Sequence, residues 1–256
     1  MNIDIPIIFE DENVLVINKP AGLNVHGDGF REEKTLVDWL TTRYPEISEV
    51  GENMVSQKGE EIKKSGLVHR LDKDTSGVMI IAKNQEAFEF LKNQFHGRET
   101  KKIYRAIVSG AFKMEPGEEK IIDLPIGRSA SDARKRVASP RIRGTKREAV
   151  TAFRLIENIC DKYAYIEAEP KTGRTHQLRA HFKAYNHPII GDELYNPKDD
   201  GGGLMKRQAL HAYSLTVKLP CFAKATQDEA KGEEKTFKAP LASDFEQALE
   251  KLKASC

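Results

Sequence analysis

The chain has 256 residues, and its 41 lysines and arginines nearly balance its 39 aspartates and glutamates, which gives a net charge of +2. This length is enough for one substantial core or for two small lobes around a cleft, so a single catalytic unit is expected. A net charge so close to zero does not by itself indicate a charged partner. Only a local concentration of charge along the sequence could indicate one.

Nothing in the sequence predicts export or a membrane span. No run of about 18 apolar residues occurs, and the first residues do not combine a basic segment with an apolar core. The three cysteines, Cys160, Cys221 and Cys256, are odd in number, far apart and outside any Cys-x-x-Cys pair. We therefore expect ordinary reduced thiols in a soluble cytoplasmic protein without a membrane partner.

The N-terminal region predicts strands followed by one helix. Residues 7–18 predict an edge strand, a turn and a fully buried strand. Judged from its position alone, Lys19 is a solvated charge at the end of the buried strand. Residues 35–44 predict a helix, because apolar residues recur at helical spacing and Thr35 and Asp38 form a possible capping box.

Residues 46–65 are polar, contain two glycines and show no periodicity, which indicates a mobile surface segment rather than a domain boundary. The segment ends just before the polar loop described next. It is a candidate lid or RNA-contacting loop, and a passive insertion is equally compatible with its composition.

Residues 69–77 are polar and turn-forming, and they directly precede an apolar run, residues 78–82, that predicts a buried strand. Asp72 and Asp74 are the two carboxylates at the mouth of this strand. A carboxylate held there beside a fixed cation such as Arg70 would have a lowered pKa and would stay ionised. An ionised carboxylate suits a nucleophile better than a proton donor.

The same residues admit three other interpretations. A calcium loop of the EF-hand type fits Asp72, Asp74 and Ser76, but its twelfth position, which should be a bidentate glutamate, is Lys83. Nucleophilic catalysis by Ser76 lacks the Gly-x-Ser-x-Gly elbow. A capped turn without chemistry is the common outcome for an arbitrary string of such residues, so these residues alone do not decide the question.

A helix and a strand are predicted next. Residues 85–96 have apolar side chains at three- and four-residue spacing, and Gly97 fits the C-cap of that helix. Residues 101–110 alternate as a strand, with Tyr104 on the same face as small apolar residues. This pattern alone favours a packed core tyrosine with its hydroxyl satisfied.

Positive charge concentrates in residues 128–147, where eight cations accompany a single acid, Asp132. Charge runs are usually solvated loops, but a local excess of this size in a near-neutral chain is a candidate contact for phosphates. Such contacts would add to the salt dependence of binding rather than to sequence readout. The cations are Arg128, Arg134, Lys135, Arg136, Arg141, Arg143, Lys146 and Arg147.

The remaining chain predicts strands at residues 150–156 and 163–169, a helix with Thr175 as its N-cap, and a terminal helix over residues 244–253. Four histidines in this half invite a metal interpretation, but their spacing supplies no His pair at i, i+4 and no thiolate cluster completes a site. They are His176, His181, His187 and His211, and we expect no bound metal.

Four sequence blocks together resemble the RluA-type pseudouridine synthases. They are Lys-Pro-x-Gly at 19–22, His-Arg-Leu-Asp-x-x-Thr-Ser-Gly at 69–77, Lys-x-Tyr-x-Ala-x-Val-x-Gly at 102–110 and Gly-Arg-Thr-His-Gln-Leu-Arg-x-His at 173–181. The resemblance implies an α+β fold, with a bent, mixed, mostly antiparallel sheet flanked by helices and two lobes around a central active-site cleft. It implies one catalytic domain over residues 1–256, with its core at about 7–250 and without the N-terminal S4 module of some relatives.

The resemblance also implies roles for individual residues. Asp72 is the catalytic carboxylate, Arg179 pairs with it, and Tyr104 stacks on the target base and is placed to help remove the C5 proton. Leu178 lines the pocket, and Arg70 fills the space that the flipped nucleotide leaves. Further substrate-binding candidates in the same block are Arg174, His176 and Gln177. The RNA-backbone candidates are Arg134, Lys135, Arg136, Arg141, Arg143, Lys146 and Arg147.

The implied activity is isomerisation of specific uridines in structured RNA, with large-subunit ribosomal RNA foremost and transfer RNA as the other target class. The bond to C1′ moves from N1 to C5 of the same base, so no cofactor is required, and no nucleotide-binding fingerprint occurs. Two rival classes are a non-catalytic RNA-binding protein and a nucleosidase-type hydrolase, for which Asp74 is the nearby second carboxylate. Nothing in the sequence requires more than a monomer.

Overall fold

The structure consists of β-strands flanked by helices. It is a computed structural model that describes residues 4–27, 33–55, 59, 61–142, 144–220 and 232–256. The strand pairing is mixed and mostly antiparallel, and four α-helices occur in the described residues, which confirms the predicted α+β class. The chain divides into two compact units. One comprises Met1–Lys101 and Ser214–Pro240, and the other comprises Lys102–Tyr213 and Leu241–Cys256.

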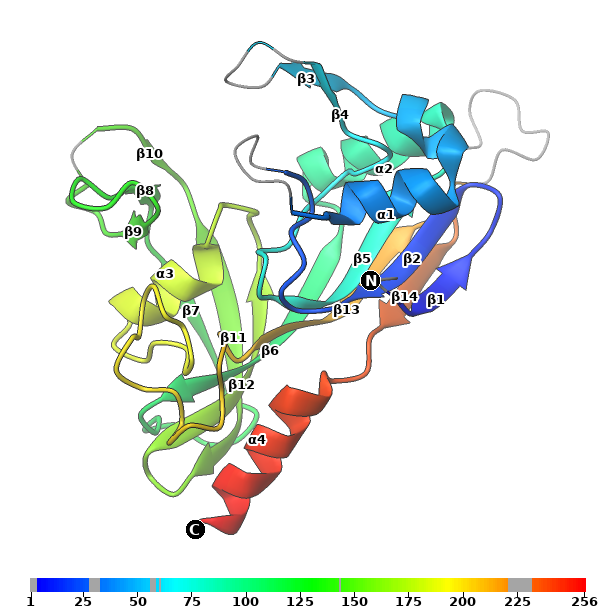
Figure 1. Cartoon of the computed structure of the whole chain (residues 1–256). Coiled ribbons are helices and arrows are strands. Elements are labelled where there is room, and N and C mark those ends of the chain that lie inside the picture. The colour runs from blue at the N-terminus through cyan, green and yellow to red at the C-terminus, as the bar shows by residue number, and fades with distance from the viewer. Residues whose placement is uncertain (1–3, 28–32, 56–58, 60, 143, 221–231) are drawn as a thin grey trace. The chain divides into compact units, whose positions relative to one another are not determined.

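Figure 1 shows the elements in chain order. The helices are α1 (Leu36–Arg43), the 3-10 helix η1 (Pro45–Glu49), α2 (Gln85–Gly97), α3 (Gln177–Ala184) and α4 (Ser243–Ala254). The strands are β1 (Ile7–Glu10), β2 (Val14–Lys19), β3 (Asn53–Val55), β4 (Glu61–Lys63), β5 (Ser76–Ala82), β6 (Lys101–Ser109), β7 (Glu119–Asp123), β8 (Ile126–Arg128), β9 (Arg136–Ala138), β10 (Lys146–Arg147), β11 (Val150–Ile159), β12 (Tyr163–Pro170), β13 (Leu210–Lys218) and β14 (Glu234–Lys238). Among the described residues, no helix is long and apolar enough to cross a membrane.

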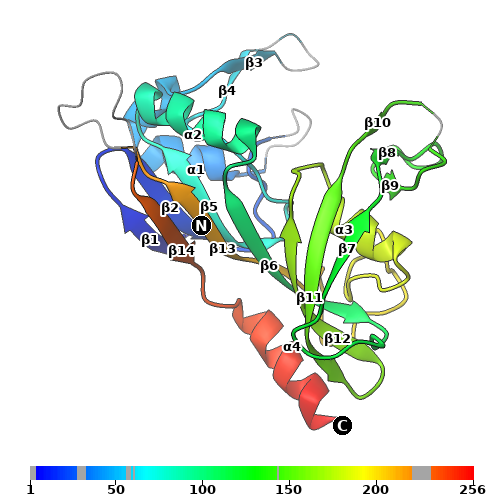
Figure 2. The same ribbon diagram turned by 180° about the vertical axis from the view of Figure 1, so that it is seen from behind.

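The first unit contains a sheet in which β1, β2, β5 and β13 are neighbours in that order, and β14 also pairs with β13. β5 is buried over its whole length, because apolar residues occupy both of its faces. Helices α1 and α2 lie over one face of this sheet (Figure 1, Figure 2). The antiparallel register pairs Lys19 at the end of β2 with Gly77 at the start of β5. The loop that precedes β5 therefore lies beside the end of β2.

Two sequence predictions in this unit have different outcomes. The capping box of α1 is confirmed, since the Thr35 hydroxyl accepts from the Asp38 N–H and the Asp38 carboxylate accepts from the Thr35 N–H. The sequence predicted a mobile surface segment with no helix or strand over residues 46–65, but η1 and an antiparallel β3–β4 pair occur there. Its mobility stays a prediction. Elements this short depend on contacts with the rest of the fold, which a single sequence does not display.

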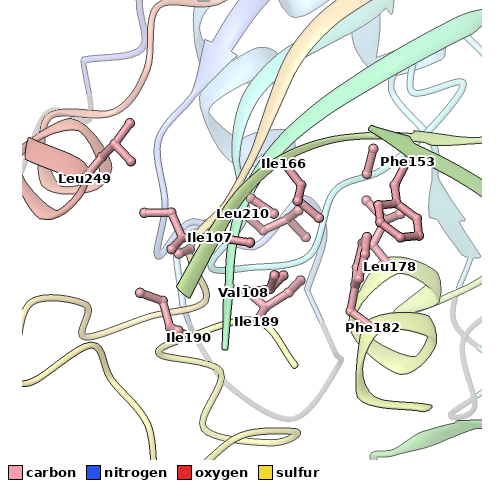
Figure 3. Packing of buried hydrophobic residues seen from close by; sticks show 14 of the residues in the cluster. Ile107, Val108, Phe153, Ile166, Leu178, Phe182, Ile189, Ile190, Leu210 and Leu249 are labelled. Carbon is pink, nitrogen blue, oxygen red and sulfur yellow. The ribbon is translucent and has the colours of Figure 1, made fainter. Parts of the chain in front are cut away.

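The second unit contains strands β6, β12, β11 and β7 in that order, with antiparallel pairing throughout. On β11, Phe153 stands opposite Ala168 of β12 and contacts Phe182 of α3, with ring centroids 5.4 Å apart. Tyr165, three residues before Ala168, points to the other face and contacts Phe245 of α4 at 6.2 Å. Helices α3 and α4 therefore cover opposite faces of this sheet. Figure 3 shows part of the cluster of buried apolar side chains that these elements form.

The basic stretch folds as a small antiparallel sheet with strand order β10, β8, β9, which we call the basic sheet (residues 126–147). A second, smaller core joins it to α3. In that core Ile126 of β8 and Ala138 of β9 pack with Ala180 of α3 and with Tyr195. The basic sheet therefore has a fixed attachment to the helix that carries Arg179.

The predicted start of α3 is wrong by one residue. His176, not Thr175, is the N-cap, and its backbone adopts a left-handed conformation with φ of 54°. The His176 side chain makes no capping hydrogen bond to the helix. The His176 side chain instead hydrogen-bonds with Tyr195, as described below.

The prediction of reduced thiols is wrong for two cysteines. Cys160 and Cys256 form a disulfide with Cα atoms 5.0 Å apart, although 96 residues separate them in the sequence. Cys160 directly follows β11 and Cys256 lies just beyond α4, so the contact arises when α4 packs on the sheet of its own unit. Sequence spacing does not reveal such a pairing. Cys221 lies outside the described residues.

His181 of α3 has no exposed surface, and both of its ring nitrogens have protein partners. Nε2 lies 2.9 Å from the Leu124 carbonyl oxygen, which can only accept, so Nε2 carries the proton. Nδ1 lies 2.8 Å from Oγ1 of Thr151 and accepts from that hydroxyl. Burial lowers the pKa of His181, against an opposing effect of the hydrogen bond to Leu124, so the neutral ring is favoured.

We expect acid to destabilise the protein through His181. Its folded-state pKa lies below the ordinary value of 6.5, so this contribution is complete above pH 6.5 and is lost as the pH falls below it. A His181→Gln variant keeps one donor and one acceptor but does not titrate. Urea unfolding between pH 7.5 and 5.5 should show a smaller loss of stability in this variant than in the wild type. Equal losses would contradict the assignment.

Candidate active site

The loop of residues 69–77 is anchored to β5 by its first histidine. The Nε2 atom of His69 accepts from the Ile80 N–H at 3.0 Å, and its ring stacks on Phe95 with centroids 4.5 Å apart. Inside the loop the Thr75 N–H donates to the Asp72 carbonyl at 3.1 Å. Asp72 is half-buried whereas Thr75 is buried. The loop therefore holds the Asp72 backbone in a fixed turn at the start of a buried strand.

Lys19 donates a hydrogen bond to this loop, and the prediction that it is a solvated charge is wrong. Its side chain has no exposed surface. The ammonium donates to the carbonyls of Pro20 at 2.8 Å, Leu23 at 3.0 Å and Lys73 at 2.9 Å. Three donors thus meet three acceptors, one of them in the residue next to Asp72. The sequence pattern could not show this, because burial of a lysine depends on partners from distant loops.

Arg70 is exposed, and its guanidinium lies 3.2 Å from Nε2 of His26. Burial, and secondarily the charge of Arg70, lower the pKa of His26. A neutral His26 ring can accept a hydrogen bond from Arg70, which restrains the guanidinium beside the loop that carries Asp72.

In the second unit, Tyr104 stands on β6 opposite Ala168 of β12 and packs against the main core while staying half-exposed. Leu178 of α3 is buried in the same core (Figure 3). A half-exposed ring on a rigid strand is a suitable stacking surface, because it does not need to be ordered on binding.

Arg179 forms a buried, bidentate ion pair with Asp192. Its Nε and Nη2 atoms lie 2.6 Å and 2.8 Å from the two carboxylate oxygens. Asp192 has no exposed surface and also accepts from the N–H groups of Leu194 and Tyr195, both at 3.0 Å. A guanidinium held by two parallel bonds has a fixed plane and direction. Asp192 lies outside the four sequence blocks named above, so no role was predicted for it.

Gln177 makes its hydrogen bonds within the protein. Its amide oxygen accepts from the Thr172 hydroxyl at 2.7 Å and from the Arg174 N–H at 3.0 Å. Its amide nitrogen donates to the Val150 carbonyl at 3.0 Å and to the Thr151 hydroxyl at 3.1 Å. These bonds tie the start of α3 to β11. Its role in substrate binding stays a prediction.

Arg174 and His176 are half-buried at the same end of α3. The Nε atom of Arg174 donates to the Glu148 carbonyl at 3.0 Å, next to the basic sheet. His176 has its Nδ1 atom 3.2 Å from the Tyr195 hydroxyl. Both remain candidates for contact with the substrate.

The described cations of the basic sheet differ in exposure. Lys135 and Arg136 are half-buried, whereas the others are open to solvent. Arg134 pairs with Asp132, an exposed contact of little energetic consequence that lowers the pKa of Asp132 to about 2. Arg143 lies outside the described residues. The exposed members are Arg128, Arg134, Arg141, Lys146 and Arg147.

The predicted site residues fall into two groups, each built on its own unit. Arg70 and Asp72 belong to the first, and Tyr104, Leu178 and Arg179 belong to the second. Within the described residues, no three His, Cys, Asp or Glu side chains are grouped so that they could hold a metal ion.

Comparison with known proteins gives a consistent result. The family model described as RNA pseudouridylate synthase matches residues 13–184. A relative from Synechocystis, named as an uncharacterized RNA pseudouridine synthase, is 36% identical over 97% of this chain and 69% of its own length. A relative from Borreliella burgdorferi, named ribosomal large subunit pseudouridine synthase D, is 42% identical over 84% of this chain and 62% of its own length. The chain thus spans roughly two thirds of these relatives.

A solved structure is also similar. The human RNA pseudouridylate synthase domain containing 4 has a TM-score of 0.68 and 26% identity, with 97% of this chain and 93% of that chain covered. The family match extends over the loop at residues 69–77 and the start of α3, where the motif resemblance is strongest. The chain therefore belongs to the RNA pseudouridylate synthase family, as its RluA-type motifs predicted.

Proposed function

We propose that this chain converts uridine to pseudouridine in structured RNA, with Asp72 as the catalytic carboxylate. The observation that carries the proposal is the loop of residues 69–77, which His69 and Lys19 fix at the start of β5. The reaction breaks the C1′–N1 bond and forms a C1′–C5 bond, while C5 loses a proton and N1 gains one. Asp72 either attacks C1′ or removes a sugar proton, and both routes require the ionised carboxylate.

The other proposed roles are those that the motif resemblance implies. Arg179, which Asp192 holds by two bonds, is the cation that we propose to pair with the Asp72 carboxylate. Tyr104 stacks on the uracil that has left the RNA helix, and Leu178 gives the pocket an apolar wall. Arg70 takes the space that the extruded nucleotide leaves. Exclusion of water prevents hydrolysis of the sugar intermediate, which would leave the uracil detached from the RNA.

The proposed substrates are large-subunit ribosomal RNA and transfer RNA. The name of the Borreliella relative supports the first, and the basic sheet supports an extended phosphate contact for either. Folded RNA presents shape and backbone as much as sequence, so a rigid basic sheet suits both classes.

The function is tested with transcripts of ribosomal and transfer RNA that carry tritium at C5 of uridine. Isomerisation releases the tritium to water and keeps the base attached to the RNA, whereas a hydrolase releases labelled uracil. In parallel, carbodiimide treatment and reverse transcription map pseudouridine in cells with and without the gene. Loss of one or more stops names the substrate. No tritium release from any RNA and no changed stop would overturn the proposal.

The basic sheet is expected to contribute binding energy through phosphates. The triple variant Arg141→Ala, Lys146→Ala, Arg147→Ala removes three exposed cations. Its affinity for substrate RNA should fall at least about tenfold, and the slope of log affinity against log salt should become shallower by about 2 to 3. Filter binding from 50 to about 300 mM salt measures both.

A matched control removes the same charge elsewhere. Lys113, Lys206 and Lys251 are also exposed and lie outside the basic sheet. Their triple alanine variant should change the slope by less than about 1. An equal change in the two triple variants would show that net charge, and not the basic sheet, governs binding.

A further inference from the structure

The geometry points to Tyr195 as a positioning residue that transmits RNA binding at the basic sheet to the start of α3 and thus to Arg179. This inference rests on the proposed function, because it assumes that the basic sheet binds RNA phosphates and that Arg179 takes part in catalysis. Tyr195 itself is only 5% exposed, so it acts through its neighbours rather than by touching RNA.

The hydroxyl of Tyr195 joins two elements. It accepts from the backbone N–H of Arg136 on β9 at 2.7 Å. The same hydroxyl also hydrogen-bonds with Nδ1 of His176, which lies 3.2 Å away. His176 is the N-cap of α3 and makes no capping bond to that helix. One hydroxyl therefore connects a strand of the basic sheet to the N-cap residue of α3.

The ring and backbone of Tyr195 join the same helix at a second point. The guanidinium of Arg179 lies over the ring, 5.1 Å from its centroid. The Tyr195 N–H donates at 3.0 Å to the Asp192 carboxylate, which also holds Arg179 by two bonds. A displacement of Tyr195 therefore moves both the aromatic ring beneath the Arg179 guanidinium and the Asp192 carboxylate that binds it.

Apolar packing makes this connection stiff. Tyr195 shares the small core with Ile126, Ala138 and Ala180, which belong to β8, β9 and α3. Close-packed side chains transmit displacement instead of absorbing it. Phosphates that bind the exposed cations would act on β8 and β10, and β8 pairs with β9. Tyr195 contacts both β9 and the surroundings of Arg179.

The test compares Tyr195→Phe with Tyr185→Phe. The first keeps the ring and removes only the hydroxyl link. The second removes a hydroxyl at the other end of α3, where the ring packs on Phe112 and Phe153. We expect Tyr195→Phe to lower kcat about tenfold with an RNA Kd within about twofold of wild type, because the exposed cations remain. Tyr185→Phe should match wild type in both.

A double-mutant cycle separates transmission from loss of structure. The basic triple variant should lower kcat in the wild-type background but only RNA affinity in the Tyr195→Phe background. Additive effects on kcat in the cycle, or wild-type kcat in Tyr195→Phe, would overturn the inference. Urea unfolding of each variant shows that the comparison is made on folded protein.

Hydrogen exchange tests the link without activity. Substrate RNA should slow exchange of the α3 amides in the wild type and not in Tyr195→Phe, although both bind RNA. His176→Leu, which removes the other partner of the hydroxyl, should reproduce this loss. Protection of α3 that persists in both variants refutes the link. Wild-type protein that shows the protection but makes no pseudouridine would refute the proposed function alone.

Discussion

Asp72→Asn is expected to abolish pseudouridine formation, with a loss of kcat of at least about 10⁴-fold, while the fold and RNA binding remain. Asparagine has nearly the same shape but no charge, so it can neither attack C1′ nor remove a sugar proton. The backbone bond from Thr75 to the carbonyl of residue 72 does not depend on the side chain. Tritium release, RNA binding and thermal unfolding measure the three properties on one preparation.

Asp74→Asn is the matched control, because Asp74 is a half-buried carboxylate in the same loop. We expect its kcat to stay within about threefold of wild type. Normal turnover by Asp72→Asn would contradict the assignment of Asp72 as the catalytic carboxylate. An equally large loss from Asp74→Asn would instead indicate a two-carboxylate mechanism of the hydrolase type.

Lys19→Met is expected to lower the free energy of unfolding by about 3 kcal/mol, because three carbonyls lose the ammonium that satisfies them in a buried site. Methionine fills a similar volume, so the change reports on the polar contacts rather than on a cavity. The catalytic loop is fastened by one of these contacts, at Lys73, so kcat should also fall, by about tenfold.

Lys73→Met provides the comparison for Lys19. Lys73 pairs with Glu33 at 2.9 Å, and both side chains are about two-fifths exposed, so its loss should cost less than about 1 kcal/mol. Urea unfolding of both variants gives the difference. If Lys19→Met were as stable as the wild type, the cost of burying the ammonium would cancel its three hydrogen bonds.

The sequence predicted those elements whose signals are local. The capping box of α1, the apolar run of β5 and the alternation in β6 and β12 each depend on neighbours in the chain, and the structure has these elements close to the predicted bounds. The end of α2 differs slightly, since Arg98 rather than Gly97 takes the left-handed conformation. Local chemistry therefore determines type and place to within a residue or two.

The parts that could not be predicted depend on distant partners. Lys19 looked solvated because its acceptors come from two separate loops. Arg179 could be named from a motif, but its bond to Asp192 spans 13 residues through a turn that the sequence does not display. The strands of the basic sheet are too short and too charged to show a period of two. In each case tertiary packing supplied what the pattern lacked.

The course of β13 has a consequence for synthesis of the protein. Its first residues, Leu210–Tyr213, belong to one unit and its last, from Ser214, belong to the other, so the Asp72 unit is not contiguous in the chain. During translation β5 is made early, but its neighbour β13 is made only after most of the second unit. Until then the edge of β5 that pairs with β13 stays unpaired. An apolar strand with an open edge invites wrong pairing. Nascent chains should therefore be most prone to aggregation, and most dependent on chaperones, just before residue 218 leaves the ribosome.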